Sequence, residues 1–589
     1  MNYLFLFSIG PVQSFIAQAR KTQDLYGASQ LLSDLAKAAI EQAQHEGIDL
    51  VFPKTIKGVQ SLPNRFIGQI GSDSKEALET VGRNIEQKVK HVFTAAANNA
   101  LRKTHATETP QFWKQINNHL EINWLFHPIE SDDTEGYKKA YQEIEVFMAS
   151  VKNIRIFEQN EEQGRKCSLD GERNALFFGQ DTNDKYLSQG QEISNGIWLN
   201  KNEGLSAIGL VKRAYDVQRF PSTAKIALMD YLKEQIQGNS DLSNKYEAYQ
   251  LRLGGRLQFD EQLCYEENVS MDYLKKNGFS NILKRDSFNE IQALHRSIFS
   301  SKDLPKYYAV MAFDGDSMGK VLSGELLHEE KADLAQFQGQ VSGLLSNYAQ
   351  WVWQNVKEPQ GAVAYTGGDD FLGFLNLSHL FEVVRRLRYE FDESVYQKLK
   401  NKETGDSLLR EPFTFSAGIV IAHYKTPLSI VLQKVRELEK TAKNKGKRDA
   451  FAIAVLKHSG DMHEACFKWN TLEGMPQWNG LEKLVKYLSD DCSETFIRSL
   501  DREFRYITDG DGKAKYPQII KAELMRLIKK SLKEDKKWKL TEVFNTLERL
   551  LSIELKRSGD LADLDNFIEA LKIALFIKRK TKINDGVTA

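Results

Sequence analysis

The stretch that decides the fold is residues 362–375, which read AVAYTGGDDFLGFL. Its apolar ends, residues 362–365 and 371–375, predict two buried strands joined by a turn at Thr366-Gly367-Gly368-Asp369-Asp370. The two glycines let the turn adopt positive φ and let a ligand approach the backbone closely. Two adjacent carboxylates repel one another unless a cation lies between them. An ordinary surface turn is the alternative, but the apolar flanks favour the tip of a central hairpin.

The segments on either side of this hairpin complete an α+β unit. Residues 307–313 predict a strand, 315–319 a turn, and Lys320 the start of a helix. Residues 413–422 and 451–456 predict two more strands, and between them apolar residues recur at helical spacing from Leu428 to Ala442. This order of strands and helices is the one expected of a ferredoxin-like palm.

A fainter copy of the same order opens the chain. Residues 3–9 predict a strand, Gly10-Pro11 a turn, and Val12 the start of a helix that breaks at Gly27. Residues 50–52 and 65–67 predict short strands, and residues 75–150 are mostly helical in pattern. Only the second copy carries carboxylates at its turns, so the sequence predicts a duplicated palm with one active copy.

Four domains are expected in a chain of 589 residues. They are a first, inactive palm (1–160), a helical domain (161–300), a second, active palm (301–460) and a C-terminal helical domain (461–589). Lys+Arg and Asp+Glu both number 80, so any polyanion contact must come from local patches, such as the surplus of 20 basic over 15 acidic residues in 501–589. A solvated helical face explains that surplus equally well. Four widely spaced cysteines and no long apolar segment favour a cytoplasmic protein without a membrane span.

The chemistry is expected where the first strand of the second palm meets the hairpin. Asp314 ends that strand and lies before a glycine turn into a helix, whose N-terminus favours phosphate. In a palm the strand and the hairpin are neighbours, so Asp314, Asp369 and Asp370 can converge and hold two Mg²⁺ or Mn²⁺ ions. Between 425 and 448 there are 8 basic and 2 acidic residues. One or two of them, from Lys443, Lys445, Lys447 and Arg448, are expected to meet a triphosphate.

These motifs resemble those of the large palm/cyclase subunit of type III CRISPR effector complexes, in its type III-B (Cmr) form. The matching stretches cover both palms and the domain between them. They are Ile9-Gly10-Pro11-Val12-Gln13-Ser14-Phe15-Ile16, Leu62-Pro63-Asn64-Arg65-Phe66, Phe220-Pro221-Ser222-Thr223, Phe313-Asp314-Gly315-Asp316-Ser317-Met318-Gly319-Lys320 and Gly367-Gly368-Asp369-Asp370.

The resemblance implies a crRNA-guided antiviral complex whose palms make cyclic oligoadenylate from ATP when target RNA is bound. The acceptor is a second ATP or another adenosyl compound such as S-adenosylmethionine. The implied partners are other Cmr subunits, namely a small helical subunit and the RNA-recognition-fold subunit that caps the guide 5′ end, together with crRNA and target RNA. The match makes Asp314, Asp369 and Asp370 metal ligands, with Asp369 and Asp370 catalytic. The expected nucleotide-binding residues are Ser14, Asn64, Arg65, Gly315, Asp316, Ser317, Met318, Gly319, Gly367, Gly368, Lys443 and Lys447.

The sequence departs from the family pattern in two places. Many members begin with an HD nuclease domain, whereas this chain starts at the first palm and none of its 11 histidines is followed by Asp, so no HD nuclease activity is expected. Where the family often has a zinc-binding Cys-x-x-Cys, the second cysteine is replaced by Asp170, three residues after Cys167. A structural zinc is therefore not expected.

The sequence also leaves two alternative functions and contains two weaker motifs. A catalytically quiet scaffold would not need to hold like charges together, and a diguanylate cyclase normally pairs its one palm with a copy in another subunit. His463 and Cys466 are three apart on an expected helix, since the chain from 465 onward is helical in pattern, but two ligands do not make a metal site. Asp509-Gly510-Asp511-Gly512-Lys513 is interpreted as a turn rather than a calcium loop.

Overall fold

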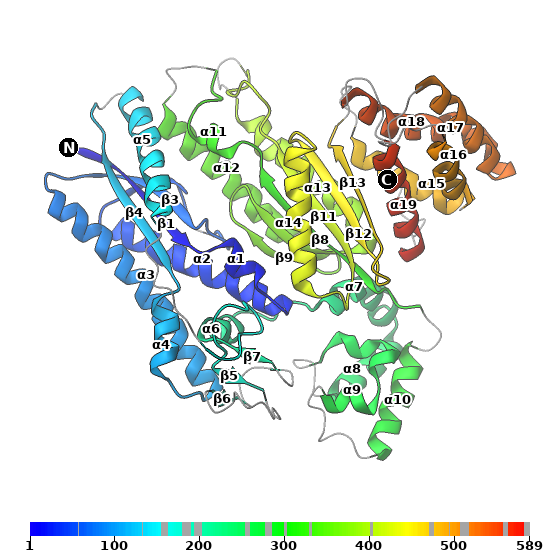
Figure 1. The fold of residues 1–589 in the computed structure, drawn as a ribbon, viewed down its shortest axis with the longest axis horizontal. Helices are drawn as coiled ribbons and strands as arrows, with labels where there is room; N and C mark the ends of the chain where they lie inside the picture. The colour runs from blue at the N-terminus through cyan, green and yellow to red at the C-terminus, as the bar shows by residue number, and fades with distance from the viewer. Residues whose placement is uncertain are drawn as a thin grey trace.

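The computed structural model places two mainly antiparallel sheets side by side, each covered by helices, with further helices at one edge (Figure 1). Both sheets belong to palm domains, so the protein is of the α+β class. The structure describes residues 1–56, 58–131, 134–154, 163–179, 190–193, 199, 203–253, 259–276, 285–299, 303–328, 333–400, 405–470, 476–493, 495–506, 517–557 and 564–581.

The first palm is a four-stranded sheet with the order β2-β3-β1-β4. The central strand β1 pairs antiparallel with β3 and with β4, and its side chains from Leu4 to Phe7 are fully buried. Helix α5 packs on β1 and β4, while α2 and α3 pack on one another. The elements are β1 (Asn2–Gly10), α1 (Gln13–Ala17), α2 (Thr22–His45), β2 (Asp49–Phe52), β3 (Arg65–Gly71), α3 (Lys75–Thr104), α4 (Pro110–Asn117), β4 (Glu121–Pro128) and α5 (Thr134–Asn153).

Two details of the first palm differ from the sequence prediction. Strand β4 interrupts the segment that was expected to be helical. The helix break lies before Thr22 rather than at Gly27, because the Asp24 carboxylate accepts hydrogen bonds from the backbone N–H groups of Arg20 (3.2 Å) and Lys21 (3.0 Å) and so starts α2 there. Gly27 lies inside α2, where a Cβ atom would come within 2.6 Å of the Lys212 carbonyl oxygen. This glycine therefore permits close helix packing.

The second palm repeats the strand order of the first and extends it. Its six-stranded sheet has the order β13-β12-β11-β8-β10-β9, in which β11-β8-β10-β9 matches β4-β1-β3-β2 of the first palm. Strand β12 is parallel to β11, and α14 connects them. The elements are β8 (Tyr307–Gly315), α11 (Met318–Leu322), α12 (Leu334–Asn355), β9 (Gly361–Thr366), β10 (Phe371–Asn376), α13 (Leu380–Ser394), β11 (Phe415–His423), α14 (Leu428–Asn444), β12 (Ala450–Leu456) and β13 (Met462–Lys468).

Strand β13 corrects the prediction that the chain becomes helical from about 465. It pairs antiparallel with β12 and places His463 and Cys466 on a strand rather than a helix. His463 pairs with Glu569 (2.7 Å), and the Cys466 backbone N–H donates to Asn566 (2.7 Å), both on α19. These two residues therefore join the sheet to the last helix.

The segment between the palms holds a small sheet as well as the expected helices. The strands β5 (Phe177–Phe178), β6 (Gln191–Glu192) and β7 (Gly204–Leu205) form the sheet. At its edge, Asp170 accepts hydrogen bonds from the backbone N–H groups of Glu172 (2.9 Å) and Arg173 (3.1 Å) and from the Ser206 hydroxyl (3.1 Å). The helices are α6 (Ala207–Ala214), α7 (Thr223–Tyr231), the π-helix η2 (Leu232–Gln237), α8 (Ser240–Arg252), the 3₁₀ turns η3 (Glu261–Cys264) and η4 (Glu266–Asn268), α9 (Met271–Lys276) and α10 (Arg285–Phe299).

The motif Phe220-Pro221-Ser222-Thr223 is the joint between three parts of the chain. The Pro221 carbonyl accepts a hydrogen bond from Thr22 of the first palm (2.9 Å). Thr223 donates to the Tyr424 carbonyl of the second palm (3.0 Å), and Ser222 donates to Glu261 of the helical segment (3.2 Å). The Phe220 ring also lies 5.6 Å from the ring of Phe374 on β10. The motif thus fixes the two palms relative to one another.

In the described residues after β13, five helices form the C-terminal part. They are α15 (Gln477–Asp490), α16 (Thr495–Arg505), α17 (Pro517–Ser531), α18 (Leu540–Arg557) and α19 (Leu564–Lys580), with the 3₁₀ turn η8 (Glu534–Lys539) between α17 and α18. The turn predicted at 509–513 lies outside the described residues. Within the described residues, no helix is long and apolar enough to cross a membrane.

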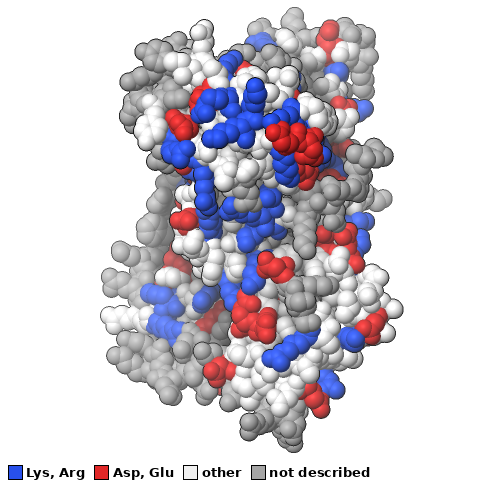
Figure 2. Space-filling model, turned by 90° about the vertical axis from the view of Figure 1, so that its right-hand side faces the viewer, with Lys and Arg blue, Asp and Glu red and all other residues white. Residues whose placement is uncertain are grey.

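Basic side chains gather on the face that carries these helices, with acidic side chains among them (Figure 2). Several basic residues of the C-terminal part are held in ion pairs. Lys539 pairs with Asp491 at 2.9 Å, Lys521 with Glu548 at 2.6 Å, and Lys572 with Glu569 at 2.9 Å. Of the three pairs, only Lys539 with Asp491 offsets the basic surplus of residues 501–589, because Asp491 lies outside that range.

Candidate active site

The end of β8 and the β9–β10 turn meet as the sequence predicts. Strand β8 pairs with β10, and the Gly315 backbone N–H donates to the Asp369 carbonyl (3.0 Å). A Cβ atom on Gly315 would come within 2.8 Å of the Asp369 Cβ, so glycine permits this approach. Gly368 has φ +100°, which side chains rarely adopt. The glycines therefore bring Asp314 and the Asp369-Asp370 pair to one end of the sheet.

Burial raises the pKa of all three carboxyl groups, and neighbouring negative charges add to the effect. Burial raises the pKa of Asp370 to about 7, with a further contribution from the charge of Asp314. Burial and the charges of Asp370 and Asp314 raise the pKa of Asp369 well above its usual range, and burial raises the pKa of Asp314. Like charges thus accumulate at the hairpin tip, and their mutual repulsion would be relieved by a bound cation.

One carboxylate oxygen of Asp370 has no hydrogen-bond partner among the described residues. The Tyr365 hydroxyl is hydrogen-bonded to Asp370, yet Asp370 Oδ1 is buried without a hydrogen-bond partner among the described residues. A buried carboxylate oxygen without a partner is costly, and it is the kind of donor that a divalent cation takes. The residues at the hairpin tip therefore fit Mg²⁺ or Mn²⁺ in chemical type.

Asp314 has a partner of its own. Its carboxylate forms an ion pair with Lys443 at the end of α14, and Lys443 also lies 3.3 Å from Glu439 one turn earlier. Within the described residues, no three or more His, Cys, Asp or Glu side chains are grouped as a metal site. The Lys443 ammonium is the cation that neutralises Asp314 in this arrangement.

A cavity of about 640 Å³ lies between the two palms and reaches this hairpin. The second palm contributes Gly367, Asp369 and Asp370 to its wall, with Met318 and Gly319 at the start of α11. The first palm contributes Asn64 and Arg65 from the start of β3, and Tyr141 and Glu145 from α5. Residues about 300 positions apart in the sequence therefore face one space.

The first-palm wall of the cavity carries opposite charges. Arg65 forms an ion pair with Glu145, and both side chains are about one-third exposed. The Asn64 side-chain amide donates to the Ile9 carbonyl (3.1 Å), and the Asn64 backbone carbonyl accepts a hydrogen bond from the Ile9 N–H (2.9 Å). The guanidinium is thus held at the cavity by α5, and the amide by the end of β1.

Not all predicted site residues lie at this cavity. Ser14 is exposed on α1 and does not line the cavity, and Lys447 is exposed beyond the end of α14. Asp316 is only 6% exposed, and its carboxylate accepts hydrogen bonds from Thr414 (2.7 Å) and Ser416 (2.7 Å). Ser317 adopts the left-handed conformation with φ 58° and turns the chain into α11.

Sequence reasoning missed three side chains of the site. Tyr365 reaches Asp370 from β9, Glu439 lies beside Lys443, and Glu145 pairs with Arg65. Glu439 precedes Lys443 by four residues on a helix, a spacing that predicts contact. Tyr365 stands two residues before the glycines, but no local pattern in the sequence marks Glu145.

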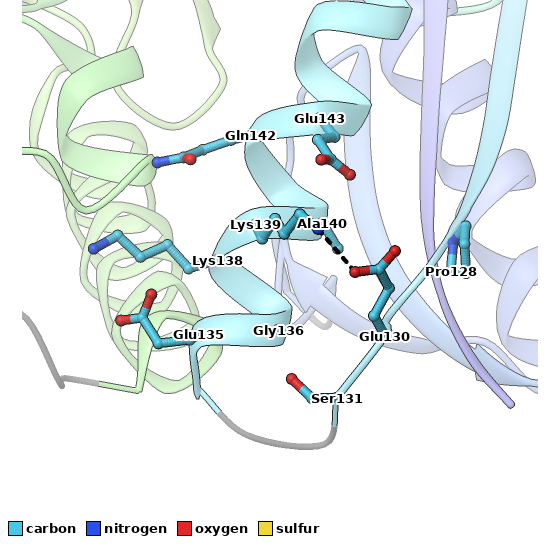
Figure 3. Close-up of a pocket in the computed structure, with 10 residues that line it drawn as sticks. All are labelled: Pro128, Glu130, Ser131, Glu135, Gly136, Lys138, Lys139, Ala140, Gln142 and Glu143. Atoms are coloured by element: carbon cyan, nitrogen blue, oxygen red, sulfur yellow. Dashed lines mark hydrogen bonds and ion pairs between the residues drawn. The ribbon is translucent and has the colours of Figure 1, made fainter.

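A second hollow near the cavity has no comparable chemistry. It lies where β4 passes into α5 and is lined by residues from Pro128 to Glu143 (Figure 3). Two of its charged groups, Lys139 and Glu130, form an ion pair on the surface (2.8 Å). Surface ion pairs of this kind are ordinary, so the cavity between the palms is the better candidate site.

The fold and the cavity define a class of protein with two palms, in which buried carboxylates of one palm face an amide and a guanidinium of the other. The family model described as Cas10/Cmr2, second palm domain, matches residues 307–452, and the model of the Cmr2 N-terminal region matches residues 4–98. The chain therefore carries a domain similar to the second palm of Cas10/Cmr2 and a region similar to the Cmr2 N-terminus.

Individual proteins and structures are similar to most of the chain. The CRISPR system Cmr subunit Cmr2 of Pyrococcus furiosus is 25% identical over 667 residues, which cover 97% of this chain and 74% of the relative. Among solved structures, the apo type III-B Cmr-beta complex contains a chain with a TM-score of 0.63 at 13% identity, covering 98% of this chain and 82% of that one. The Cmr-beta structure bound to cognate target RNA gives the same TM-score and identity, covering 83% of its chain. These structural matches support the fold.

Proposed function

We propose that the cavity between the palms is the active site of an ATP-dependent nucleotidyltransferase that makes a cyclic oligoadenylate-type messenger within a crRNA-guided complex. The observation that carries the proposal is the convergence of Asp369 and Asp370 with Asn64 and Arg65 on one cavity of about 640 Å³. A cavity of that size suits small ligands such as nucleotides, and its two walls carry different chemistry.

Each wall has its own task in this proposal. Asp314, Asp369 and Asp370 would hold Mg²⁺ or Mn²⁺, which when bound activates a ribose 3′-hydroxyl and neutralises the leaving pyrophosphate. Tyr365 orients Asp370 through its hydroxyl. Lys443 would exchange its contact with Asp314 for the triphosphate. Arg65 and Asn64 would position the acceptor nucleotide, the guanidinium by pairing with phosphate.

The partners proposed for the chain are other Cmr subunits, crRNA and target RNA. Support comes from the matches to the Cas10/Cmr2 palm and the Cmr2 N-terminal region, and from the similarity to a chain of the Cmr-beta complex bound to cognate target RNA. In this setting, target RNA would switch synthesis on. A subunit that serves only as a scaffold would bind the same partners. Partner binding therefore does not distinguish it from an enzyme, and the test must measure product.

The test incubates the assembled complex with labelled ATP or GTP, with and without target RNA, in Mg²⁺ or Mn²⁺. An added arm with S-adenosylmethionine identifies the acceptor. We expect an ATP-derived product that depends on target RNA and is lost in the Asp369→Asn/Asp370→Asn variant. A complex that assembles and binds target RNA but yields no product with any acceptor would identify a scaffold, and a GTP product would identify a diguanylate-type cyclase.

A further inference from the structure

The carboxylate of Asp316 ties the metal-binding end of β8 to a basic loop. Strand β8 ends at Gly315, and Asp316 then turns toward β11, where Thr414 and Ser416 each donate a hydrogen bond of 2.7 Å. Its oxygen Oδ2 accepts a further bond from the backbone N–H of Asp449 (2.9 Å). Asp449 closes the segment 443–449, which carries Lys443, Lys445, Lys447 and Arg448 and is called the basic loop below.

The backbone of the basic loop adopts an unfavourable conformation that contacts with the rest of the protein must stabilise. Lys447, Arg448 and Asp449 have φ of 54°, 59° and 43°, so three consecutive residues with side chains adopt the left-handed conformation. This conformation is unfavourable for side-chain-bearing residues and persists only where the surroundings impose it. The like charges of the loop add repulsion. Contacts from outside the loop must therefore hold it.

Among the described residues, four groups supply such contacts. The backbone N–H of Trp469 donates to the Asp449 carbonyl (3.1 Å). Asp316 accepts the Asp449 N–H, and Arg388 donates to the Asp449 side chain (3.0 Å). Lys468 donates to the carbonyls of Lys447 (2.9 Å) and Arg448 (2.6 Å). Of these groups, only Asp316 also belongs to the turn that carries Asp314. Asp316 therefore relates the far end of the basic loop to the carboxylates.

We propose that Asp316 is a positioning residue that holds the basic loop in register with Asp314, Asp369 and Asp370, so that the loop's cations meet the triphosphate of the bound nucleotide. The proposal rests on the proposed function, because it assigns a task within the same site. Asp316 does not bind the nucleotide itself. Its carboxylate is occupied by Thr414, Ser416 and the Asp449 N–H, and it does not line the cavity.

Asp314 and Asp316 are only two residues apart in the sequence, but they contact different parts of the basic loop. Asp314 forms an ion pair with Lys443, at the start of the basic loop, and Asp316 binds the N–H of Asp449, at its end. The β8 end therefore holds both ends of the loop. Loss of Asp314 would remove a ligand and one contact, whereas loss of Asp316 would free the loop end and leave all three carboxylates of the site in place.

The experiment compares Asp316→Ala, Asp316→Asn and Ser416→Ala in the assembled full-length complex. Asparagine keeps an oxygen that can accept the Asp449 N–H, and Ser416→Ala removes a donor to Asp316 while it leaves that bond intact. Loop order is measured by limited trypsin cleavage after Lys445, Lys447 and Arg448, followed by mass spectrometry. Affinity for labelled ATP is measured by equilibrium dialysis, and KM and kcat for ATP are measured separately.

We expect Asp316→Ala to speed cleavage in the basic loop and weaken ATP binding by about ten- to hundredfold, the loss typical of a hydrogen bond to a charged group. KM should rise by that factor with a smaller change in kcat, and Asp316→Asn and Ser416→Ala should stay close to the wild type. If Asp316→Ala does not assemble, Asp316→Glu supplies the comparison, because it keeps the charge and displaces the oxygens.

Several results would overturn the proposal. Unchanged loop cleavage in Asp316→Ala would show that the loop does not need Asp316. A fall in kcat with unchanged ATP affinity, or an equal defect in Asp316→Asn, would assign Asp316 to the chemistry instead. Cleavage and dialysis need no turnover, so a wild-type complex without product would refute the proposed function while the positioning role is still tested.

Discussion

Replacing Asp370 by asparagine is expected to stabilise the second palm at alkaline pH while it abolishes synthesis. The pKa of Asp370 lies at about 7, against 3.8 for an unperturbed aspartate. A pKa raised by about three lowers the free energy of unfolding of the protein with ionised Asp370 by about 4 kcal/mol. The carboxyl group is partly exposed to the cavity, and the amide that replaces it must also be buried. We therefore expect asparagine to restore about half of this free energy of unfolding, or about 2 kcal/mol.

The sign of the pH dependence follows from the raised pKa. The contribution of Asp370 to stability is fully present below the unfolded pKa of about 4 and is lost as pH rises through the folded pKa of about 7. The asparagine variant has no such loss. The difference in stability between variant and wild type should therefore be near zero at about pH 4 and reach its full size above about pH 8.

The assay is thermal unfolding of the full-length chain at both ends of this range, with and without Mn²⁺. About 2 kcal/mol corresponds to a rise in Tm of about 4–8 °C for a domain of this size. Mn²⁺ should raise the Tm of the wild type by binding the folded carboxylates and should raise that of the variant much less. A variant that is no more stable at alkaline pH, or a gap that is independent of pH, would refute the electrostatic reasoning.

Three further outcomes follow from other contacts. Arg213→Ala should destabilise the chain by about 3–5 kcal/mol in chemical denaturation, since it removes the buried cation that pairs with the carboxylates of Asp24 (2.7 Å) and Glu203 (2.9 Å), whereas Arg83→Ala on the surface should leave the midpoint unchanged. Arg65→Ala should weaken ATP binding in equilibrium dialysis by about tenfold, because a guanidinium–phosphate contact is lost. The isolated chain, with 80 basic and 80 acidic residues, should bind random RNA weakly in filter binding, and the binding should fall steeply with salt.

The fold could be predicted where local pattern and tertiary structure agree. The strands beside the Gly-Gly-Asp-Asp turn, β9 and β10, have apolar runs and glycine turns that mark them in any context. Strand β4 lies between two helices and has half-buried residues throughout, so its polar and apolar residues give no clear strand pattern. Its place is decided by pairing with β1 and by Gly82 of α3, where a Cβ would come within 2.5 Å of the Trp124 ring.

The candidate site was predictable to the extent that its chemistry is local. Asp369 and Asp370 follow from the turn, and Asp314 follows from the position of β8 beside it. The role of Asp316 was not predictable, because residues two apart share a face only while a strand continues, and β8 ends at Gly315 between the two aspartates. Spacing alone also gives no reason for Asn64 and Arg65 to reach a hairpin about 300 residues later.

The two palms use one backbone arrangement with different side chains. In the first palm the Ile9 N–H donates to the Asn64 carbonyl (2.9 Å), and in the second the Gly315 N–H donates to the Asp369 carbonyl (3.0 Å). The same turn thus presents an amide and a guanidinium in one copy and two carboxylates in the other. Both face the same cavity. The proposed joining of two nucleotides would use this difference, because carboxylates with a bound metal ion would activate the reacting phosphate, while the Arg65 guanidinium and the Asn64 amide would hold the second nucleotide without competing for the metal.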